Sequence, residues 1–186
     1  MNHTSNKSDF EDLTTNLKDL AYSYLEKYNP SKQQLKVYLL KKYLLKIKGT
    51  KSKKEVTSII DEIISNLEKN KLLNDEMYSD SKARMFLRRG YSLNKINQSL
   101  RNKGIEDKYV KQSIEKIKEN QIEPDFVSAL KLCKRRRIGP TRPDSNRELF
   151  YKKDMGILAR GGFSFDLSKR VLDLDADEFK KLIKII

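Results

Sequence analysis

Reactive and metal-binding side chains are scarce in this sequence. Its 186 residues include one cysteine, one histidine and no tryptophan. The cysteine, Cys133, cannot form an internal disulfide, and its place beside Leu130 and Leu132 on the apolar stripe of an expected helix predicts that it is buried. His3 is the only histidine and lies in the polar N-terminal tail, so the residue inventory excludes a histidine–cysteine metal site and a histidine-based catalytic triad.

Glycine is also rare, with seven in the chain, and none opens a strand-to-helix turn. This excludes phosphate-loop and dinucleotide fingerprints. Pro143-Asp144 formally matches the proline–acid element of metal-dependent nucleases, and Glu178-Phe179-Lys180 matches their acid-x-lysine element. Such elements normally lie on paired strands that hold both acids on one metal ion, whereas here they fall in a basic loop and an expected helix. The sequence therefore predicts that the protein is not an enzyme and has no metal or cofactor.

Long apolar runs are missing as well, so no transmembrane segment can be drawn. Residues 1–9 are polar and show neither a signal peptide nor an Arg-rich targeting helix. The stretch 35–47 has the lysines of a membrane-surface helix, but its apolar side chains spread too widely around the helix for a lipid-facing stripe. We expect a cytoplasmic protein that does not bind membranes, with a flexible tail over residues 1–12.

What the chain has in excess is positive charge. It contains 40 basic and 26 acidic residues, a formal net charge of +14. A surface of this kind favours polyanionic partners. With hydrophobic residues at 37%, the composition also suits thin helical layers better than one thick core.

One helix–break–helix phrase occurs three times, around Ser31, Ser92 and Ser164. A residue tolerant of positive φ precedes each serine by two positions, and the serine can cap the next helix. At Ser31 the cap is completed by Gln34 as a capping box. The repetition predicts an all-α fold, an elongated array of three tandem three-helix repeats.

We place the first repeat at residues 13–73, the second at 74–122 and the third at 123–186, the last with a basic insertion at 135–148. Residues 48–54 form a basic connector, either solvated or in contact with phosphate. Repeat proteins bury their cores between neighbouring units and present extended surfaces, which favours a monomeric binding module over a pocket enzyme.

The basic clusters are the best candidates for a binding surface. Arginine binds phosphates and carboxylates equally well, so these clusters suit DNA or an acidic protein surface. Each cluster could also be a solvated face without a specific partner. The candidates from charge and placement are Arg84, Arg88, Arg89, Lys95, Arg101, Lys103, Arg135, Arg136, Arg137, Arg142, Arg160, Lys169 and Arg170.

Several motifs resemble a known family. Residues 71–78, 88–92 and 100–105 look like the central signature of the RecX family, regulators of the RecA recombinase. Residues 158–166, followed by Val171 and Leu172, resemble its closing motif, and residues 20–35 resemble its opening. The resemblance spans about residues 17–173. In place of the basic residue that the second copy has at Arg89, the third copy has Gly161.

The resemblance implies a curved array of three-helix repeats that binds RecA and RecA filaments on single-stranded DNA, with contact to the single- or double-stranded DNA backbone also open. Such a regulator would suppress ATP hydrolysis and strand exchange by RecA, and so modulate DNA repair by homologous recombination and the SOS response. Two alternatives are a nonspecific nucleic-acid-binding protein and a helix–turn–helix repressor. The apolar third copy, with Phe165 after its cap, argues against base reading by the turn.

Overall fold

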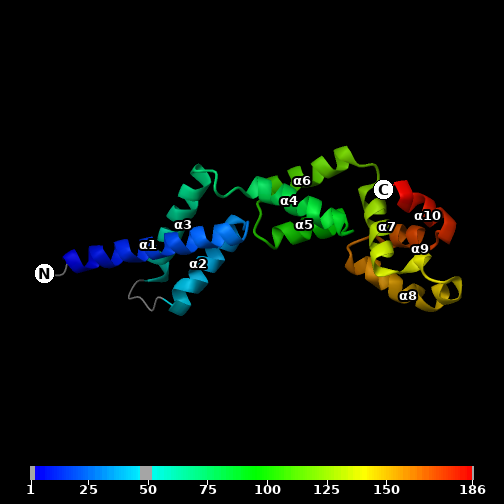
Figure 1. Cartoon of the computed structure of the whole chain (residues 1–186), viewed down its shortest axis with the longest axis horizontal. Coiled ribbons are helices and arrows are strands. Elements are labelled where there is room, and N and C mark those ends of the chain that lie inside the picture. Colours follow the sequence, from blue (N-terminus) through cyan, green and yellow to red (C-terminus); the bar gives the residue numbers. More distant parts are fainter. Residues whose placement is uncertain (1–2, 47–51, 186) are drawn as a thin grey trace. The chain divides into compact units, whose positions relative to one another are not determined.

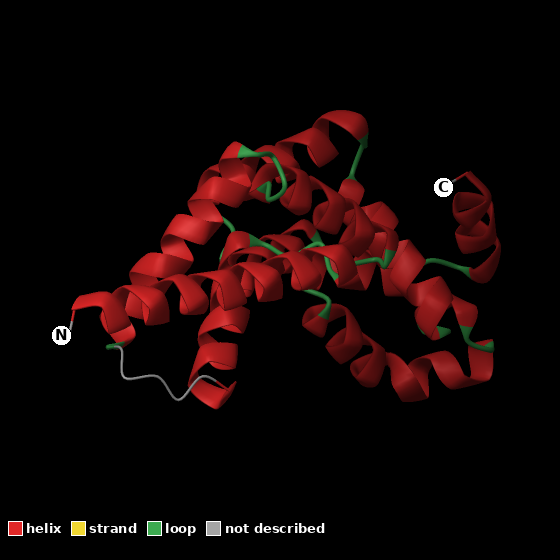
Figure 2. Cartoon of the chain, turned by 60° about the vertical axis from the view of Figure 1, so that its left-hand side comes forward, coloured by secondary structure: helices red, strands yellow, loops and turns green. Residues whose placement is uncertain are grey.

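The structure, a computed structural model, describes residues 3–46 and 52–185 (Figure 1). Within these ranges it contains ten α-helices, one 3₁₀ turn and no strand, so the predicted all-α class is confirmed (Figure 2). The helices are α1 His3–Lys27, α2 Lys32–Lys46, α3 Lys53–Lys69, α4 Asp75–Arg88, α5 Leu93–Arg101, α6 Asp107–Asn120, α7 Pro124–Arg136, α8 Asp144–Arg160, α9 Phe165–Leu172 and α10 Ala176–Ile185, and the 3₁₀ turn η1 is Gly139–Thr141. Residues 48–51 of the predicted basic connector lie outside the described residues.

None of the helices in the described ranges has the length and apolar character needed to cross a bilayer.

The three predicted breaks are present, and each serine caps the helix after it. The Gln34 N–H donates to Ser31 Oγ at 3.2 Å while the Ser31 N–H donates to the Gln34 side chain at 3.1 Å, which confirms the capping box. Ser92 and Ser164 likewise accept a hydrogen bond from the backbone N–H three residues on. In the first copy Asn29 does not adopt positive φ. Pro30, which has no N–H and cannot continue a helix, follows the end of α1 instead.

The chain divides into two compact units. The first unit comprises α1 to α3, the first turn of α4 and residues 103–105. Its core is built around the apolar stripe of α3, where Val56 and Ile60 are fully buried against Leu17, Leu35 and Leu39. Burying this stripe is the main stabilising contribution to helices that carry charge on their other faces.

Helix α1 begins at His3, where the sequence led us to expect a flexible tail over residues 1–12. Leu13, Leu17 and Ala21 are buried on one face of the helix and anchor it in the core. No glycine or proline precedes Pro30. Because extending an existing helix is much easier than starting one, the helix continues toward the N-terminus.

The second unit comprises residues 79–102 and 106 onward. Its largest core lies among α7 to α10 and includes Leu130, Leu158 and Val171. Cys133 is fully buried there, as predicted. Burial, with a smaller effect from the nearby Asp154 carboxylate, raises the pKa of its thiol to about 12, so the thiol is unreactive at neutral pH.

The predicted basic insertion at 135–148 is largely ordered into helix and turn. Helix α7 ends at Arg136, and α8 begins at Asp144 directly after Pro143. Between them Ile138, Gly139 and Pro140 are buried. A proline at the start of a helix removes an N–H that would have no partner, which explains why the chain becomes helical again so soon.

Contacts at the start of α2 define how one repeat meets the next in the first unit. The Lys32 N–H donates to Asp75 Oδ1 at the start of α4, at 2.9 Å. The Ser31 hydroxyl donates to the Lys103 carbonyl after α5, at 2.8 Å. Gly104, with φ of +75°, leaves no room for a Cβ against Gln33.

The second unit repeats this junction with α5, α7 and α8. The Leu93 N–H donates to Asp125 Oδ1 at the start of α7, at 2.7 Å, and the Ser92 N–H donates to the Gly161 carbonyl after α8, at 3.2 Å. By these two contacts helix α8 corresponds to α5, which is consistent with the predicted tandem repeats. In this correspondence Ser164 caps the helix after the counterpart of α5, so the third copy of the phrase lies one helix later than the other two.

Candidate functional site

The turn between α4 and α5 positions the site because it lies directly on α7. Gly90 has φ of +71°, and a Cβ there would lie 2.8 Å from the Ser128 carbonyl oxygen and 2.9 Å from the Leu132 nitrogen. Both neighbours are backbone atoms that cannot move aside. Only glycine allows this approach, which brings the start of α5 against α7.

The start of α5 also packs on the end of α8. Gly162 has φ of +87°, and a Cβ there would come within 3.0 Å of Lys95 Cβ. The half-buried Asp125 carboxylate accepts the Leu93 N–H. Burial raises the pKa of Asp125, and the Leu93 N–H and the charge of Lys118 oppose that rise. Three helices thus meet at one point with little freedom to separate.

A pocket of about 370 Å³ lies at this meeting point. We call it the basic pocket; it is lined by Tyr91, Lys95, Leu132, Arg135, Arg136, Ile157, Arg160 and Gly161. Four of these residues are cationic and were predicted as site residues from the sequence, and none is acidic. Within the described part of the chain the structure shows no ion pair for these four.

The walls of the basic pocket are firm and partly apolar. The Tyr91 ring stacks on Phe86 with centroids 5.4 Å apart and planes 11° apart. Leu132 and Ile157 contribute apolar surface from α7 and α8. Unpaired guanidinium groups beside an aromatic wall suit an anionic partner, either carboxylates on a protein or phosphates on a nucleic acid.

Two predicted site residues are held in ion pairs on the surface. Arg101 binds Asp107, with Nε 3.1 Å from Oδ1. Arg170 binds Glu123 with both terminal nitrogens, at 2.7 and 3.1 Å, and lies over the Phe126 ring at 4.1 Å. Hydrogen bonds from Arg170 lower the pKa of Glu123. Neither arginine lines the basic pocket.

Arg142 has a structural position. Its guanidinium donates to both oxygens of the buried Asp154, at 2.6 and 2.8 Å, and its side chain is 19% exposed. Asp154 also accepts the Gly139 N–H at 2.8 Å. Because this pair fixes the turn between α7 and α8, we do not include Arg142 in the binding surface.

The other predicted residues lie apart from the basic pocket. Arg84 lines a separate pocket between α4 and α6. Exposed positions outside both pockets are occupied by Arg88, Arg89, Arg137 and Lys169, and the half-buried Lys103 belongs to the first unit. In the described ranges, no three His, Cys, Asp or Glu side chains gather as a metal site would require.

Sequence reasoning missed the residues that shape the pocket between the charges. Leu132 and Ile157 give only the signal of ordinary core positions. Gly161 was noted for the charge it lacks, yet a Cβ there would lie 2.9 Å from the Phe163 ring and 3.1 Å from Leu132. The adjacent glycines at 161 and 162 were the available signal, since such a pair indicates that the backbone there packs closely against neighbouring helices.

The chain is similar to three curated proteins that bear the name "Regulatory protein RecX". The protein from Myxococcus xanthus is 34% identical over 161 residues, which cover 86% of this chain and 85% of the relative. The protein from Corynebacterium efficiens is 30% identical over 131 residues, covering 66% of this chain and 61% of the relative, and that from Agrobacterium fabrum is 27% identical over 116 residues, covering 61% and 58%.

A solved structure described as "Crystal structure of regulatory protein RecX" shares the fold. Its TM-score is 0.62 at 20% sequence identity, with 94% of this chain and 79% of that chain covered. No protein-family model matches the sequence. The relative from Myxococcus xanthus extends over most of both chains, and by that similarity this chain belongs to the RecX family of regulatory proteins.

Proposed function

We propose that this protein binds RecA and RecA filaments on single-stranded DNA, inhibits ATP hydrolysis and strand exchange by RecA, and so modulates DNA repair and the SOS response. Membership of the RecX family supports this proposal. The observation that carries it is the basic pocket, where four cations from three helices gather and have no ion-pair partner among the described residues. Arginines in partly apolar pockets are typical anchors of protein interfaces.

In this proposal the basic pocket receives carboxylates from the recombinase surface. Arg135, Arg136 and Arg160 can each form two parallel hydrogen bonds to one carboxylate. Lys95 adds a point charge, and Tyr91 supplies a rigid apolar wall. Arg88 and Arg89, one turn before Tyr91, extend the positive surface beyond the pocket. The protein acts by binding, and the chemistry of ATP hydrolysis belongs to its partner.

Titration of RecA activity tests the proposal. ATP hydrolysis by the cognate RecA on single-stranded DNA is measured while this protein is added well below one copy per RecA subunit. We expect a steep loss of hydrolysis, since a filament regulator acts at such amounts. Loss only at amounts that coat the DNA would instead favour the nonspecific nucleic-acid binder.

A matched pair of variants assigns the effect to the basic pocket. Arg135→Glu combined with Arg136→Glu should raise the amount needed for half-inhibition by about tenfold or more, the range expected for interface anchors. Lys111→Glu combined with Lys184→Glu changes the net charge equally, at exposed positions outside the pocket. If both pairs reduce inhibition equally, general charge is responsible and the pocket is not the site.

Salt and competition separate the two alternatives. A nonspecific binder with about six phosphate contacts should lose about 10³ in binding constant over a fourfold rise in salt. A sequence-specific repressor should prefer one duplex over bulk DNA by about 10³ or more.

A further inference from the structure

The second unit contains another pocket, of about 290 Å³, that the basic pocket does not use. We call it the α4–α6 pocket; it is lined by Asp80, Ala83, Arg84, Leu87, Ser113, Lys116, Ile117, Asn120 and Gln121. Ligand sites for cofactors and drugs usually measure about 300–1,000 Å³, so this pocket has room for little more than one side chain.

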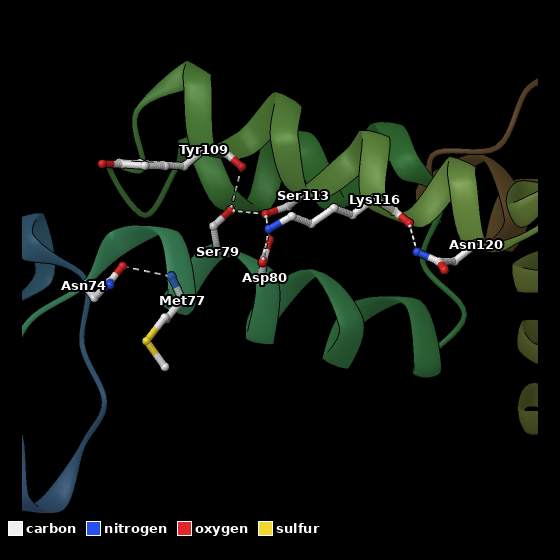
Figure 3. Close-up of polar contacts among 8 residues, drawn as sticks. All are labelled: Asn74, Met77, Ser79, Asp80, Tyr109, Ser113, Lys116 and Asn120. Carbon is white, nitrogen blue, oxygen red and sulfur yellow. Dashed lines mark hydrogen bonds and ion pairs between the residues drawn. The ribbon is translucent and has the colours of Figure 1, made fainter.

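One wall of the pocket is a fixed polar network that joins α4 to α6 (Figure 3). Asp80 accepts hydrogen bonds from Ser113 Oγ and from Lys116 Nζ, both at 2.6 Å. Ser113 Oγ is also 2.8 Å from Ser79 Oγ. Burial alone would raise the pKa of Asp80, but hydrogen bonds from Lys116 and Ser113, with the charges of Lys116 and Arg84, lower it. The carboxylate is therefore ionised, and it neutralises Lys116.

Two polar groups of the pocket are not satisfied in this way. The side-chain carbonyl oxygen of Gln121 is buried and accepts no hydrogen bond from any described residue. Arg84 is exposed, and within the described ranges the structure shows no hydrogen bond or ion pair for its guanidinium. Ala83, Leu87 and Ile117 supply apolar surface between these groups. The pocket thus presents one acceptor, one cation and an apolar floor.

We propose that the α4–α6 pocket binds one apolar residue of an acidic peptide segment on a protein partner. The apolar side chain lies on Ala83, Leu87 and Ile117. Its backbone N–H donates to the Gln121 carbonyl oxygen, and a neighbouring carboxylate accepts from Arg84. This placement satisfies a buried acceptor that otherwise destabilises the fold by an unmade hydrogen bond. It rests on the protein binding that the proposed function requires.

The chemistry of the walls favours a peptide over a nucleic acid. A phosphodiester has acceptors only and cannot donate to Gln121. A peptide offers a donor, an apolar group and an anion at neighbouring positions. Charge complementarity with Arg84 selects acidic peptides among others.

N-acetyl-L-phenylalanine is a suitable probe because it has an apolar ring, an amide N–H and a carboxylate. Titration of the full-length ¹⁵N-labelled protein should shift the amide signals of Ala83, Leu87, Ile117 and Gln121. N-acetyl-L-phenylalaninamide, which lacks the carboxylate, should bind about tenfold more weakly, and Arg84→Ala should weaken binding of the acid by a similar factor. Lys111→Ala, an exposed cation of α6 outside the pocket, should leave the affinity unchanged.

A second variant isolates the donor to Gln121. Gln121→Leu should weaken the binding of N-acetyl-L-phenylalanine severalfold. The same variant should leave the binding of 3-phenylpropionate unchanged, because that compound has no N–H. Equal binding of the acid and its amide, or shifts located elsewhere, would overturn the proposal. The probe experiment contains no RecA, so the two proposals can fail separately. If the protein inhibits RecA but the probe does not bind the α4–α6 pocket, only this inference is refuted. A probe that binds as expected to a protein that fails to inhibit RecA would refute the proposed function alone.

Discussion

The two units of this protein differ in arginine content, although both are rich in lysine. All eleven arginines of the chain lie in the second unit, whereas the first unit has fifteen lysines and no arginine. In the first unit lysines tie α2 to α3, as in the pair of Lys36 with Asp61. In the second unit some arginines bind carboxylates with two hydrogen bonds, as Arg142 does, and others line a pocket, as Arg135 does. Lysine acts as a hydrated point charge, while arginine provides a planar fork, so the difference supports the proposed binding site in the second unit.

The largest effect should come from removing a buried carboxylate of the second unit. Asp154 is 1% exposed and accepts from Arg142 and the Gly139 N–H. Asp154→Ala leaves both donors unpaired and should lower the free energy of unfolding by about 3 kcal/mol. Asp61→Ala removes the carboxylate that pairs with Lys36 on the surface of the first unit. This variant should change the free energy of unfolding by less than about 1 kcal/mol. Urea denaturation measures both, and equal losses would break the comparison between the units.

The junction glycines should be equally sensitive in both units despite the difference in cations. Gly104→Ala in the first unit and Gly162→Ala in the second each add a Cβ at positive φ against a packed neighbour. Each should lower the free energy of unfolding by about 1–3 kcal/mol. Gly156→Ala is the control, since Gly156 is helical and its Cβ would meet only Arg160 at 3.5 Å; it should stabilise by about 0.5–1 kcal/mol. A harmless Gly162→Ala would show that the α5–α8 junction is looser than described.

Conservative exchange of the cations sharpens the comparison further. Arg135→Lys combined with Arg136→Lys keeps the charge of the basic pocket but removes its planar forks. We expect the amount of protein needed to half-inhibit RecA to rise about fivefold, near 1 kcal/mol, because two-fold hydrogen bonding to carboxylates is lost. Lys41→Arg on the first unit should leave that amount unchanged. Full inhibition by the lysine variant would mean that charge alone suffices.

The smallest expected effect concerns two carboxylates of the second unit that respond oppositely to acid. The pKa of Asp125 is raised above 3.8, so this carboxyl group holds its proton more tightly in the folded state than in the unfolded state. The ionised carboxylate lowers the free energy of unfolding, and that loss is recovered as the pH falls through the folded pKa. Asp80 has a lowered pKa, so its stabilising contribution is present above 3.8 and is lost as pH falls through the folded pKa.

Asp125→Asn should keep the acceptor for the Leu93 N–H and change the free energy of unfolding at pH 7 by less than about 1 kcal/mol. Asp80→Asn should flatten the loss of stability in acid. Unfolding measured between pH 3 and pH 7 distinguishes the two; similar profiles for both variants would contradict the assigned pKa directions.

Features that depend on neighbours in the sequence were predictable. The cap at Ser31 follows from a spacing of three residues, and it is confirmed. Pairings between residues far apart in the sequence were not predictable. Arg170 binds Glu123, 47 positions away, and is therefore already paired with a carboxylate of the protein. The place of the third copy, one helix later than the other two, could not be read from the sequence, because a cap looks the same whichever helix it begins.

The candidate site was foreseen in its charges and missed in its boundaries. Lys95, Arg135, Arg136 and Arg160 were named from the sequence and line one pocket. Gly90 determines which of the thirteen candidates lie together in one pocket, because it allows the start of α5 to approach α7. That approach depends on backbone packing between helices. Periodicity within a single helix contains no information about such a crossing.

The buried Cys133 gives the molecule a built-in reporter. Its thiol has a pKa of about 12 and no exposed surface, so alkylating reagents cannot reach it until the core of α7 to α10 opens. The rate of its modification therefore measures how often that core opens, in the native protein and without an added label. For the same reason, a cysteine introduced on any surface of the molecule would be the first to react, which makes site-specific attachment of a fluorophore straightforward.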